Sequence, residues 1–235
     1  MKERPIIFND EMVRAILSGT KTMTRRPVKD RCLELFEVAA SVGECHSLQF
    51  CDIADERSQP YYREFCPFGA VGDRLWVREA YQGPLFDYEQ MEAYLEDNSK
   101  FEKQEYCEYR ADGGSRPEYC DGDDNLRHGW RPSIHMPRWA SRITLEITDV
   151  RVERLQDITN DDALSEGVPP AVELLPKYPD IYLTPRGDFA SAQVAFQRLW
   201  ESIYGDDGWD SNPWVWVIEF KRIDTGSAAG ASKGE

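Results

Sequence analysis

Residues 143–155 (ITLEITDVRVERL) carry the strongest strand signal in the chain. Polar and apolar side chains alternate through this stretch, and the apolar ones stand at Ile143, Leu145, Ile147, Val150 and Val152. A period of two places side chains of one kind on one face of a β-strand. The stretch therefore predicts a long strand with one face in an apolar core.

Shorter elements flank this strand on both sides. The expected strands are residues 5–8, residues 74–79 after the turn signal Gly72-Asp73, and residues 214–220. The expected helices are a stripe ending at Gly19, a Thr159-capped helix over 161–166 that ends at Gly167, and a stripe over 189–203 that ends at Gly205. Residues 168–186 are rich in proline and are expected to be irregular. Because no repeating strand–helix–strand rhythm occurs, we predict an α+β, mainly β fold: a small barrel with short helices.

Two long segments interrupt these elements. Residues 27–70 show no sustained period, and residues 82–127 are acidic and tyrosine-rich, with a helix expected near 88–95. We interpret both as insertions into one domain that spans residues 1–223. The small-residue tail at 224–235 is expected to be disordered.

The net charge of the chain limits the classes of molecule that it is expected to bind. The 235 residues include 28 Lys and Arg against 43 Asp and Glu, giving a net charge of −15. Non-specific duplex DNA binding draws its energy from neutralised phosphates, so it is not expected here. No apolar run is long enough to span a membrane, and the first residues lack an apolar signal core, so a cytoplasmic protein is expected.

Six cysteines are too few to predict a disulfide scaffold at this length. Cys45, His46, Cys51 and Cys66 supply soft ligands of the type that zinc accepts, but their spacing fits no standard zinc module. Reduced, partly buried thiols are the preferred interpretation. We therefore expect neither a metal nor another cofactor, and zinc stays open as the alternative.

Residues 18–26 (SGTKTMTRR) contain side chains that could act in catalysis. After a glycine that ends a helix, a bend in an extended segment would bring Lys21 and Thr24 into one pocket. A lysine held away from water can act as a base toward a threonine hydroxyl. An exposed strand of lysine, threonine and arginine is the structural alternative.

The chain resembles the ASCH domain family, which belongs to the PUA-like barrels. The resemblance is carried by five segments in order, and it is greatest to the longer forms found in phages and prophages, which share a segment like residues 130–139 (WRPSIHMPRW). The segments are Ile7-Phe8 with the following helix, Gly19 to Arg25, Gly72 to Val77, Leu155 to Gly167, and Trp216 to Phe220.

One ASCH branch consists of N4-acetylcytidine amidohydrolases with a proposed Thr-Lys-Glu triad. The resemblance implies Thr24 as nucleophile, Lys21 as base and Glu166 as the group that orients Lys21 or handles the leaving amine. Arg25 and Arg26 are then candidates for stabilising the oxyanion or binding substrate. A carboxylate beside Lys21 raises the lysine pKa while burial lowers it, and the sequence leaves this balance open.

Further candidates for substrate binding lie outside that triad. Trp76 and Trp130 could stack on a base, and Arg138 could meet a phosphate. Glu79 is a second candidate carboxylate at a strand end. For each of them, a place in the core or on a solvated rim is the structural alternative.

We therefore predict a protein with a nucleobase pocket that removes an acyl group from N4-acylated cytidine. Three alternatives stay open. The chain could be a non-catalytic reader of RNA or of modified bases in single strands, a ribonuclease, or a phage accessory protein whose acidic segment 85–125 binds a protein.

Overall fold

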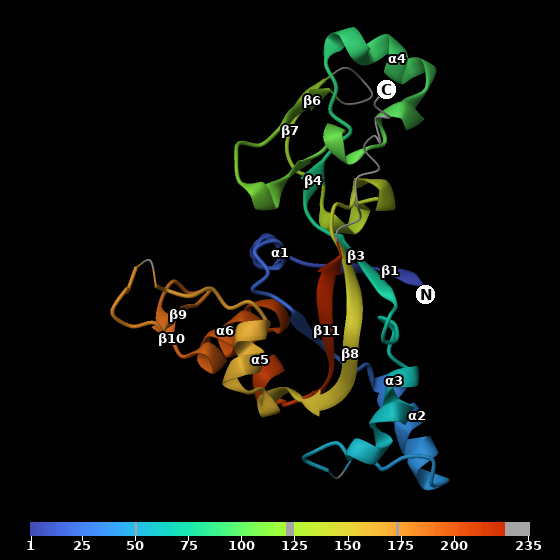
Figure 1. Ribbon diagram of the computed structural model, residues 1–235, viewed down its shortest axis with the longest axis vertical. Helices are drawn as coiled ribbons and strands as arrows, with labels where there is room; N and C mark the ends of the chain where they lie inside the picture. Colours follow the sequence, from blue (N-terminus) through green and yellow to red (C-terminus); the bar gives the residue numbers. More distant parts are fainter. Residues whose placement is uncertain (50, 121–124, 173, 224–235) are drawn as a thin grey trace, which may run out of the picture.

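A five-stranded mixed sheet forms the centre of the molecule (Figure 1). The computed structural model describes residues 1–49, 51–120, 125–172 and 174–223, so the predicted tail at 224–235 lies outside the described residues. The strands are β1 (Glu3–Ile7), β2 (Met23–Pro27), β3 (Arg74–Arg78), β8 (Thr144–Arg154) and β11 (Trp214–Ile223). Their order is β1-β3-β8-β11-β2, with β1 parallel to β3 and all other neighbours antiparallel. The mixed α/β class and the strand predicted over 143–155 are confirmed.

The predicted closed barrel is wrong for the part of the chain that the structure describes. The sheet is open, and β1 and β2 are its two edges. A side chain, rather than a strand ladder, joins these edges: Arg26 Nη2 donates to the carbonyl of Ile7 at 2.7 Å. The Arg26 guanidinium also lies over the Phe8 ring, 5.2 Å from its centroid.

β11 is covered on both of its faces. Val215 and Val217 pack into one apolar cluster, whereas Trp216, Ile218 and Phe220 pack into another. A strand buried on both faces has an almost continuous apolar sequence, which explains the run WVWVI at 214–218.

Three helices contribute to the cluster that contains Trp216. They are α1 (Asp10–Leu17), α2 (Asp30–Ser41) and α3 (Gln59–Glu64). Phe36 of α2 and Tyr62 of α3 are both fully buried there. Residues 27–70, expected to be an insertion without a sustained period, thus contain two helices that complete the main core.

Two other helices cover the second face of the sheet (Figure 1). They are α5 (Asn160–Ser165) and α6 (Ala192–Tyr204), followed by α7 (Asp207–Asp210). Thr159 caps α5 through a reciprocal capping box with Asp162, as its position before the helix predicts. The segment expected to be irregular, 168–186, contributes β9 (Tyr182–Leu183), which pairs with β10 (Phe189–Ala190).

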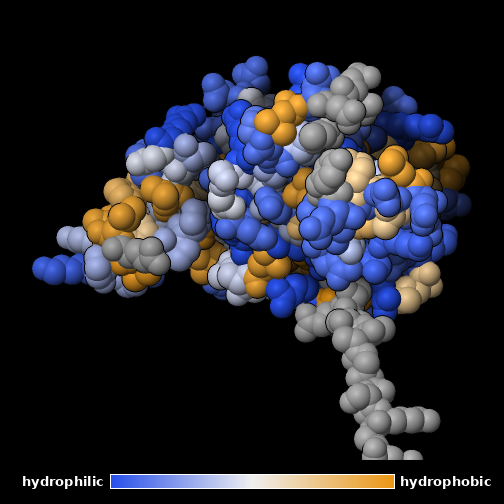
Figure 2. Space-filling view, turned by 90° about the horizontal axis from the view of Figure 1, so that it is seen from above, coloured by the Kyte–Doolittle hydropathy of each residue, from blue (hydrophilic) through white to orange (hydrophobic). Residues whose placement is uncertain are grey.

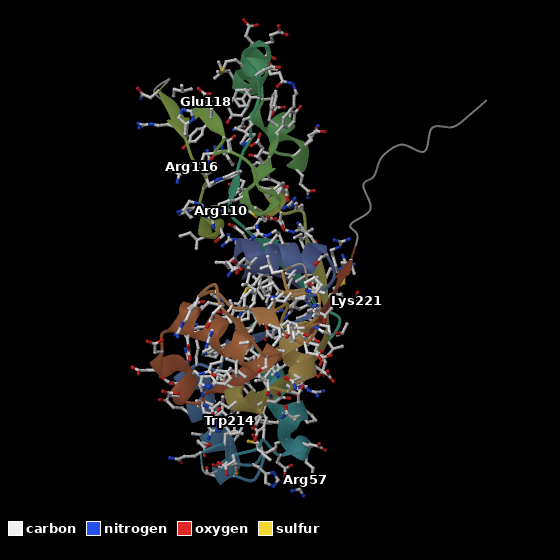
Figure 3. All side chains as sticks on the ribbon, turned by 90° about the vertical axis from the view of Figure 1, so that its left-hand side faces the viewer. Arg57, Arg110, Arg116, Glu118, Trp214 and Lys221 are labelled. Atoms are coloured by element: carbon white, nitrogen blue, oxygen red, sulfur yellow. The ribbon has the colours of Figure 1, made fainter. Side chains whose placement is uncertain are left out.

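The described part of the second insertion projects from one end of the sheet (Figure 1). Its elements are β4 (Tyr81–Gln82), α4 (Met91–Glu96), β5 (Glu108–Tyr109), β6 (Glu118–Cys120) and β7 (Leu126–His128). Phe86, Tyr94 and Phe101 form an aromatic cluster inside it. Figure 3 shows Arg110, Arg116 and Glu118 in this part, whereas Arg57 and Trp214 lie toward the opposite end of the molecule.

Polar residues cover most of the face seen in Figure 2, with apolar residues in small groups between them. This distribution agrees with the high fraction of charged residues, 30%. Among the helices of the described residues, none combines the length and the apolar character that crossing a membrane requires.

Candidate active site

Lys21 is buried where α1, β2 and α5 meet. It follows the glycine that ends α1, and its backbone N–H donates to the carbonyl of Ala15 at 3.0 Å. The next residue, Thr22, donates its N–H to the carbonyl of Ser165 at the end of α5. This short segment is therefore held between the ends of two helices, and the Lys21 side chain points inward with 0% exposure.

Glu166 is the partner of Lys21. Lys21 Nζ donates to Glu166 Oε2 at 2.6 Å and to the carbonyl of Glu166 at 2.8 Å. Burial lowers the pKa of Lys21, and this effect exceeds the opposing effect of the Glu166 carboxylate, which raises it. The sequence alone leaves open which effect on the pKa is larger. In the structure the net pKa of Lys21 is lowered, so this lysine loses its proton more easily than an exposed one.

Arg25 holds Glu166 from its other side. Arg25 Nη1 lies 3.7 Å from Glu166 Oε1, and Arg25 Nη2 donates to Asp162 Oδ2 at 2.9 Å and to Glu153 Oε2 at 3.3 Å. The Arg25 side chain is completely buried. Its two terminal nitrogens thus contact the acidic residues around the site.

Thr24 and Glu166 line the same small cavity, of about 20 Å³. A volume of this size holds about one water molecule. Three residues that line it have a buried side-chain atom without a hydrogen-bond partner: Glu166 Oε1, Arg25 Nε and Arg26 Nε. The other residues that line the cavity are Arg25, Arg26, Met12, Phe196, Leu199, Trp200, Ile203 and Tyr204.

Gly167 allows the helix α5 to end against Lys21. Its φ is +82°, in the left-handed region that favours glycine. A Cβ placed there would lie 2.8 Å from the Lys21 Cβ and 2.9 Å from the Ala15 Cβ. The glycine is therefore required both by the backbone conformation and by the close approach of α1 and Lys21.

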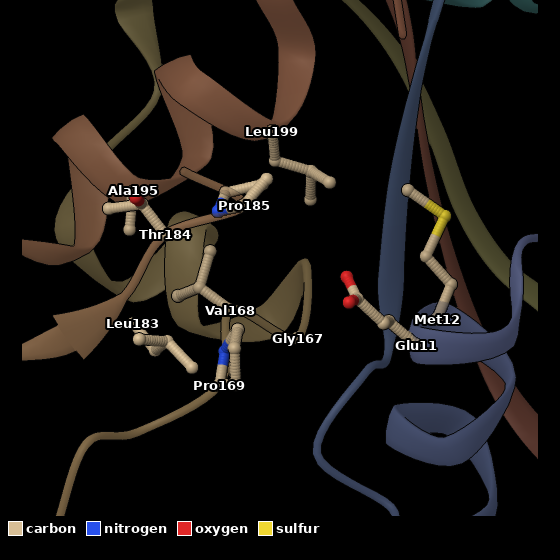
Figure 4. A pocket seen from close by; sticks show the side chains of 10 residues that line it. All are labelled: Glu11, Met12, Gly167, Val168, Pro169, Leu183, Thr184, Pro185, Ala195 and Leu199. Atoms are coloured by element: carbon tan, nitrogen blue, oxygen red, sulfur yellow. The ribbon is translucent and has the colours of Figure 1, made fainter. Parts of the chain in front are cut away.

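A second hollow, of about 50 Å³, adjoins this cavity (Figure 4). Met12 and Leu199 line both spaces. The remaining residues of the hollow are Glu11, Gly167, Val168, Pro169, Leu183, Thr184, Pro185 and Ala195.

Five of the sequence-predicted residues do not line the cavity, and Lys21, which pairs with the cavity-lining Glu166, is one of them. Glu79 forms a two-pronged ion pair with Arg142, at 3.0 and 2.9 Å. Burial raises the pKa of Glu79, and the Arg142 contacts oppose that rise. The Arg78 and Arg138 guanidinium groups lie 4.8 and 5.9 Å from the centroid of the Trp76 ring. Trp130 is half-buried, and neither it nor Arg138 lines the cavity.

Three aromatic residues of α6 were not among the sequence-predicted site residues. Phe196, Trp200 and Tyr204 recur every four residues and line the cavity opposite Thr24. The sequence shows an apolar stripe there, and such a stripe is typical of a core-facing helix. The missed signal is the continuation of the aromatic series to Tyr204, which is 39% exposed at the helix end.

The alternative of a zinc site at Cys45, His46, Cys51 and Cys66 finds no support in the described residues, where no group of three or more His, Cys, Asp or Glu is placed to hold a metal ion. His46 Nδ1 instead pairs with the Ser58 hydroxyl at 3.0 Å. Cys45 Sγ donates to the carbonyl of Phe36 at 3.4 Å. Burial raises the pKa of the Cys66 thiol, which favours the uncharged form.

Comparisons with protein-family models, with curated proteins and with solved structures gave no match to this chain.

Proposed function

We propose that the chain is an amidohydrolase that removes the acyl group from N4-acylated cytidine, with Lys21, Thr24 and Glu166 as its reacting residues. The observation that carries the proposal is the fully buried Lys21–Glu166 pair beside a cavity that Thr24 also lines. The ASCH resemblance assigns these same three positions. Lys21 is linked to the cavity through Glu166, and a buried lysine with a lowered pKa can act as a base toward a hydroxyl that reaches it.

The reaction proceeds in two halves. Thr24 Oγ1 attacks the acyl carbonyl carbon while Lys21 Nζ takes the hydroxyl proton. The carbon–nitrogen bond then breaks, the proton on Lys21 passes to the departing amine, and cytidine leaves. Water next attacks the ester on Thr24 and gives up a proton through Lys21, which releases the carboxylic acid and restores the hydroxyl.

Glu166 and Arg25 support these steps from fixed positions. The Glu166 carboxylate stabilises the Lys21 ammonium that forms when the lysine takes the proton. Arg25 Nε, a buried donor without a partner, is the candidate donor for the oxyanion. Because the same arginine is tied to Asp162, its position is set before the substrate arrives.

The cavity must open to admit a nucleoside, since about 20 Å³ accepts little more than water. Met12 has a flexible side chain that repacks easily. Tyr204 lies at the end of α6, where its side chain is 39% exposed. We assign to Trp200 and Tyr204, whose rings lie 4.3 Å apart, the role of stacking against the base.

The proposal also includes a relationship between this sheet and the PUA-like barrel. We take the sheet as a variant of the PUA-like barrel in which Arg26 spans the two edge strands. The hydrogen bond from Arg26 to Ile7 supports this assignment. Arg26 thus acts in the fold as well as at the rim of the cavity.

The test is release of cytidine from N4-acetylcytidine, measured by mass spectrometry with the purified protein. Thr24→Val keeps the shape of the buried side chain while removing the hydroxyl, so it is expected to abolish release without unfolding the chain. Thr22→Val, at an exposed neighbouring position, is the matched control and is expected to leave the rate unchanged.

Absence of release by the wild-type protein, or full release by Thr24→Val, would contradict the proposal. Binding of N4-acetylcytidine without turnover would instead favour the non-catalytic reader. Circular dichroism of both variants separates a lost nucleophile from a lost fold.

A further inference from the structure

The apolar hollow beside the cavity has a place in the proposed reaction. Glu166 lines the cavity, and the next residue, Gly167, lines the hollow. Met12 and Leu199 line both spaces, so the two spaces share part of their walls. A group attached to a carbonyl at Thr24 therefore has an apolar space within reach once these side chains shift.

The walls of the hollow match a short hydrocarbon chain. Val168, Leu183, Ala195 and Leu199 supply apolar surface. The hydroxyl of Thr184 is already engaged by Asp188 and is not offered to a ligand. About 50 Å³ of space exceeds what one methyl group fills and suits a chain of roughly three or four carbon atoms.

One charged group faces this space. The Glu11 side chain extends from α1 toward the hollow (Figure 4). In the described part of the chain, no hydrogen bond or ion pair of the Glu11 side chain is found. An anionic group entering the hollow would thus meet the negative charge of this carboxylate at its rim.

We propose that this hollow is the acyl-chain subsite of the Lys21–Thr24–Glu166 site, which accepts uncharged acyl chains longer than acetyl and rejects chains that end in a carboxylate. The inference rests on the proposed function and adds to it the chemical class of the acyl group. Burial of each further methylene is expected to raise kcat/KM by about fourfold.

The experiment compares three substrates, N4-acetyl-, N4-butyryl- and N4-succinylcytidine, with cytidine release as the readout. The wild-type protein is expected to prefer butyryl over acetyl by about fifteenfold, from two added methylenes. It is expected to process the succinyl compound more slowly than the acetyl one.

Two variants test the two halves of the inference. Leu183→Trp fills the hollow from a half-buried position and is expected to reduce the butyryl-to-acetyl ratio to near one. Glu11→Gln removes the rim charge and is expected to raise the rate with the succinyl compound relative to butyryl. The matched controls, Leu95→Trp on α4 and Glu34→Gln on α2, change exposed side chains elsewhere and leave both ratios as in the wild type.

The outcomes separate this inference from the function on which it rests. Release from the acetyl compound with ratios that neither Leu183→Trp nor Glu11→Gln alters would overturn the subsite and leave the amidohydrolase standing. No release from any of the three compounds would overturn both.

Discussion

At the residue scale, the site depends on close packing around Lys21. Gly167, Ala15 and Lys21 meet within distances that leave no room for a further carbon atom. This contact fixes where α5 ends and hence where the Glu166 carboxylate lies. The position of Lys21 is thus set by small residues that have no chemistry of their own.

Gly167→Ala is expected to lower the free energy of unfolding by about 2–5 kcal/mol, because a left-handed backbone and an overpacked contact both oppose it. Gly19→Ala is the matched control. Its φ is +81°, but a Cβ there meets nothing within 4 Å, so a loss of only about 1–2 kcal/mol is expected. Urea unfolding of the two variants measures the difference, and equal losses would contradict the packing argument.

The pH dependence of the proposed reaction follows from Lys21. The lysine must be neutral to accept a proton, and burial holds its pKa below the usual 10.5. Below that lowered pKa the neutral fraction, and with it kcat/KM, is expected to rise about tenfold per pH unit and then level off. A pH–rate profile with N4-acetylcytidine tests this, and a rate that falls as pH rises through this range would exclude Lys21 as the base.

The lowered pKa of Lys21 also affects the stability of the fold. Between the folded-state pKa of Lys21 and 10.5, the unfolded chain binds more protons than the folded one. The contribution of this residue to the free energy of unfolding therefore rises with pH in that window.

At the element scale, several helices and strands could be predicted from sequence and one important helix could not. The strands at 74–79 and 214–220 and the Thr159-capped helix are confirmed because their alternation or capping signals are local. α2 lacks a side-chain cap, and its apolar residues Leu35 and Val38 are exposed, which obscures the helical stripe. Its role in the core depends on contacts with Trp216, far along the chain.

The candidate site, like the set of helices and strands, could be predicted from the sequence only in part. The short motif around Lys21 and Thr24 could be recognised locally, and the structure brings Glu166 to Lys21. The burial of Arg25 could not be predicted, because its partners Glu153 and Asp162 come from distant parts of the chain.

The contribution of α2 to the core is testable. Phe36→Ala removes a fully buried ring that packs against Tyr62 and Trp216 and is expected to cost about 3–5 kcal/mol of stability. Val38→Ala, on the same helix with 65% exposure, is expected to change stability by less than about 0.5 kcal/mol. Thermal or urea unfolding compares the two, and similar small losses would show that α2 is dispensable.

At the scale of the whole molecule, charge limits the partners. With a net charge of −15, the chain gains little from release of the counterions that surround duplex DNA. We expect no retardation of a duplex oligonucleotide at micromolar protein and physiological salt in a gel-shift assay that includes a basic DNA-binding protein as positive control. Binding that weakens steeply with salt would contradict this expectation.

The central place of β11 also bears on how the chain folds during its synthesis. β11 is the last strand of the described residues, yet it separates β8 from β2, so that Thr24 pairs with Ile218. While the ribosome is still making the chain, β2 has no neighbour in the sheet, and the apolar faces that β11 later covers stay open. Such distant pairing slows folding and leaves a nascent chain prone to aggregation. Thr24, the proposed nucleophile, therefore gains its partner in the sheet only after β11 has been made.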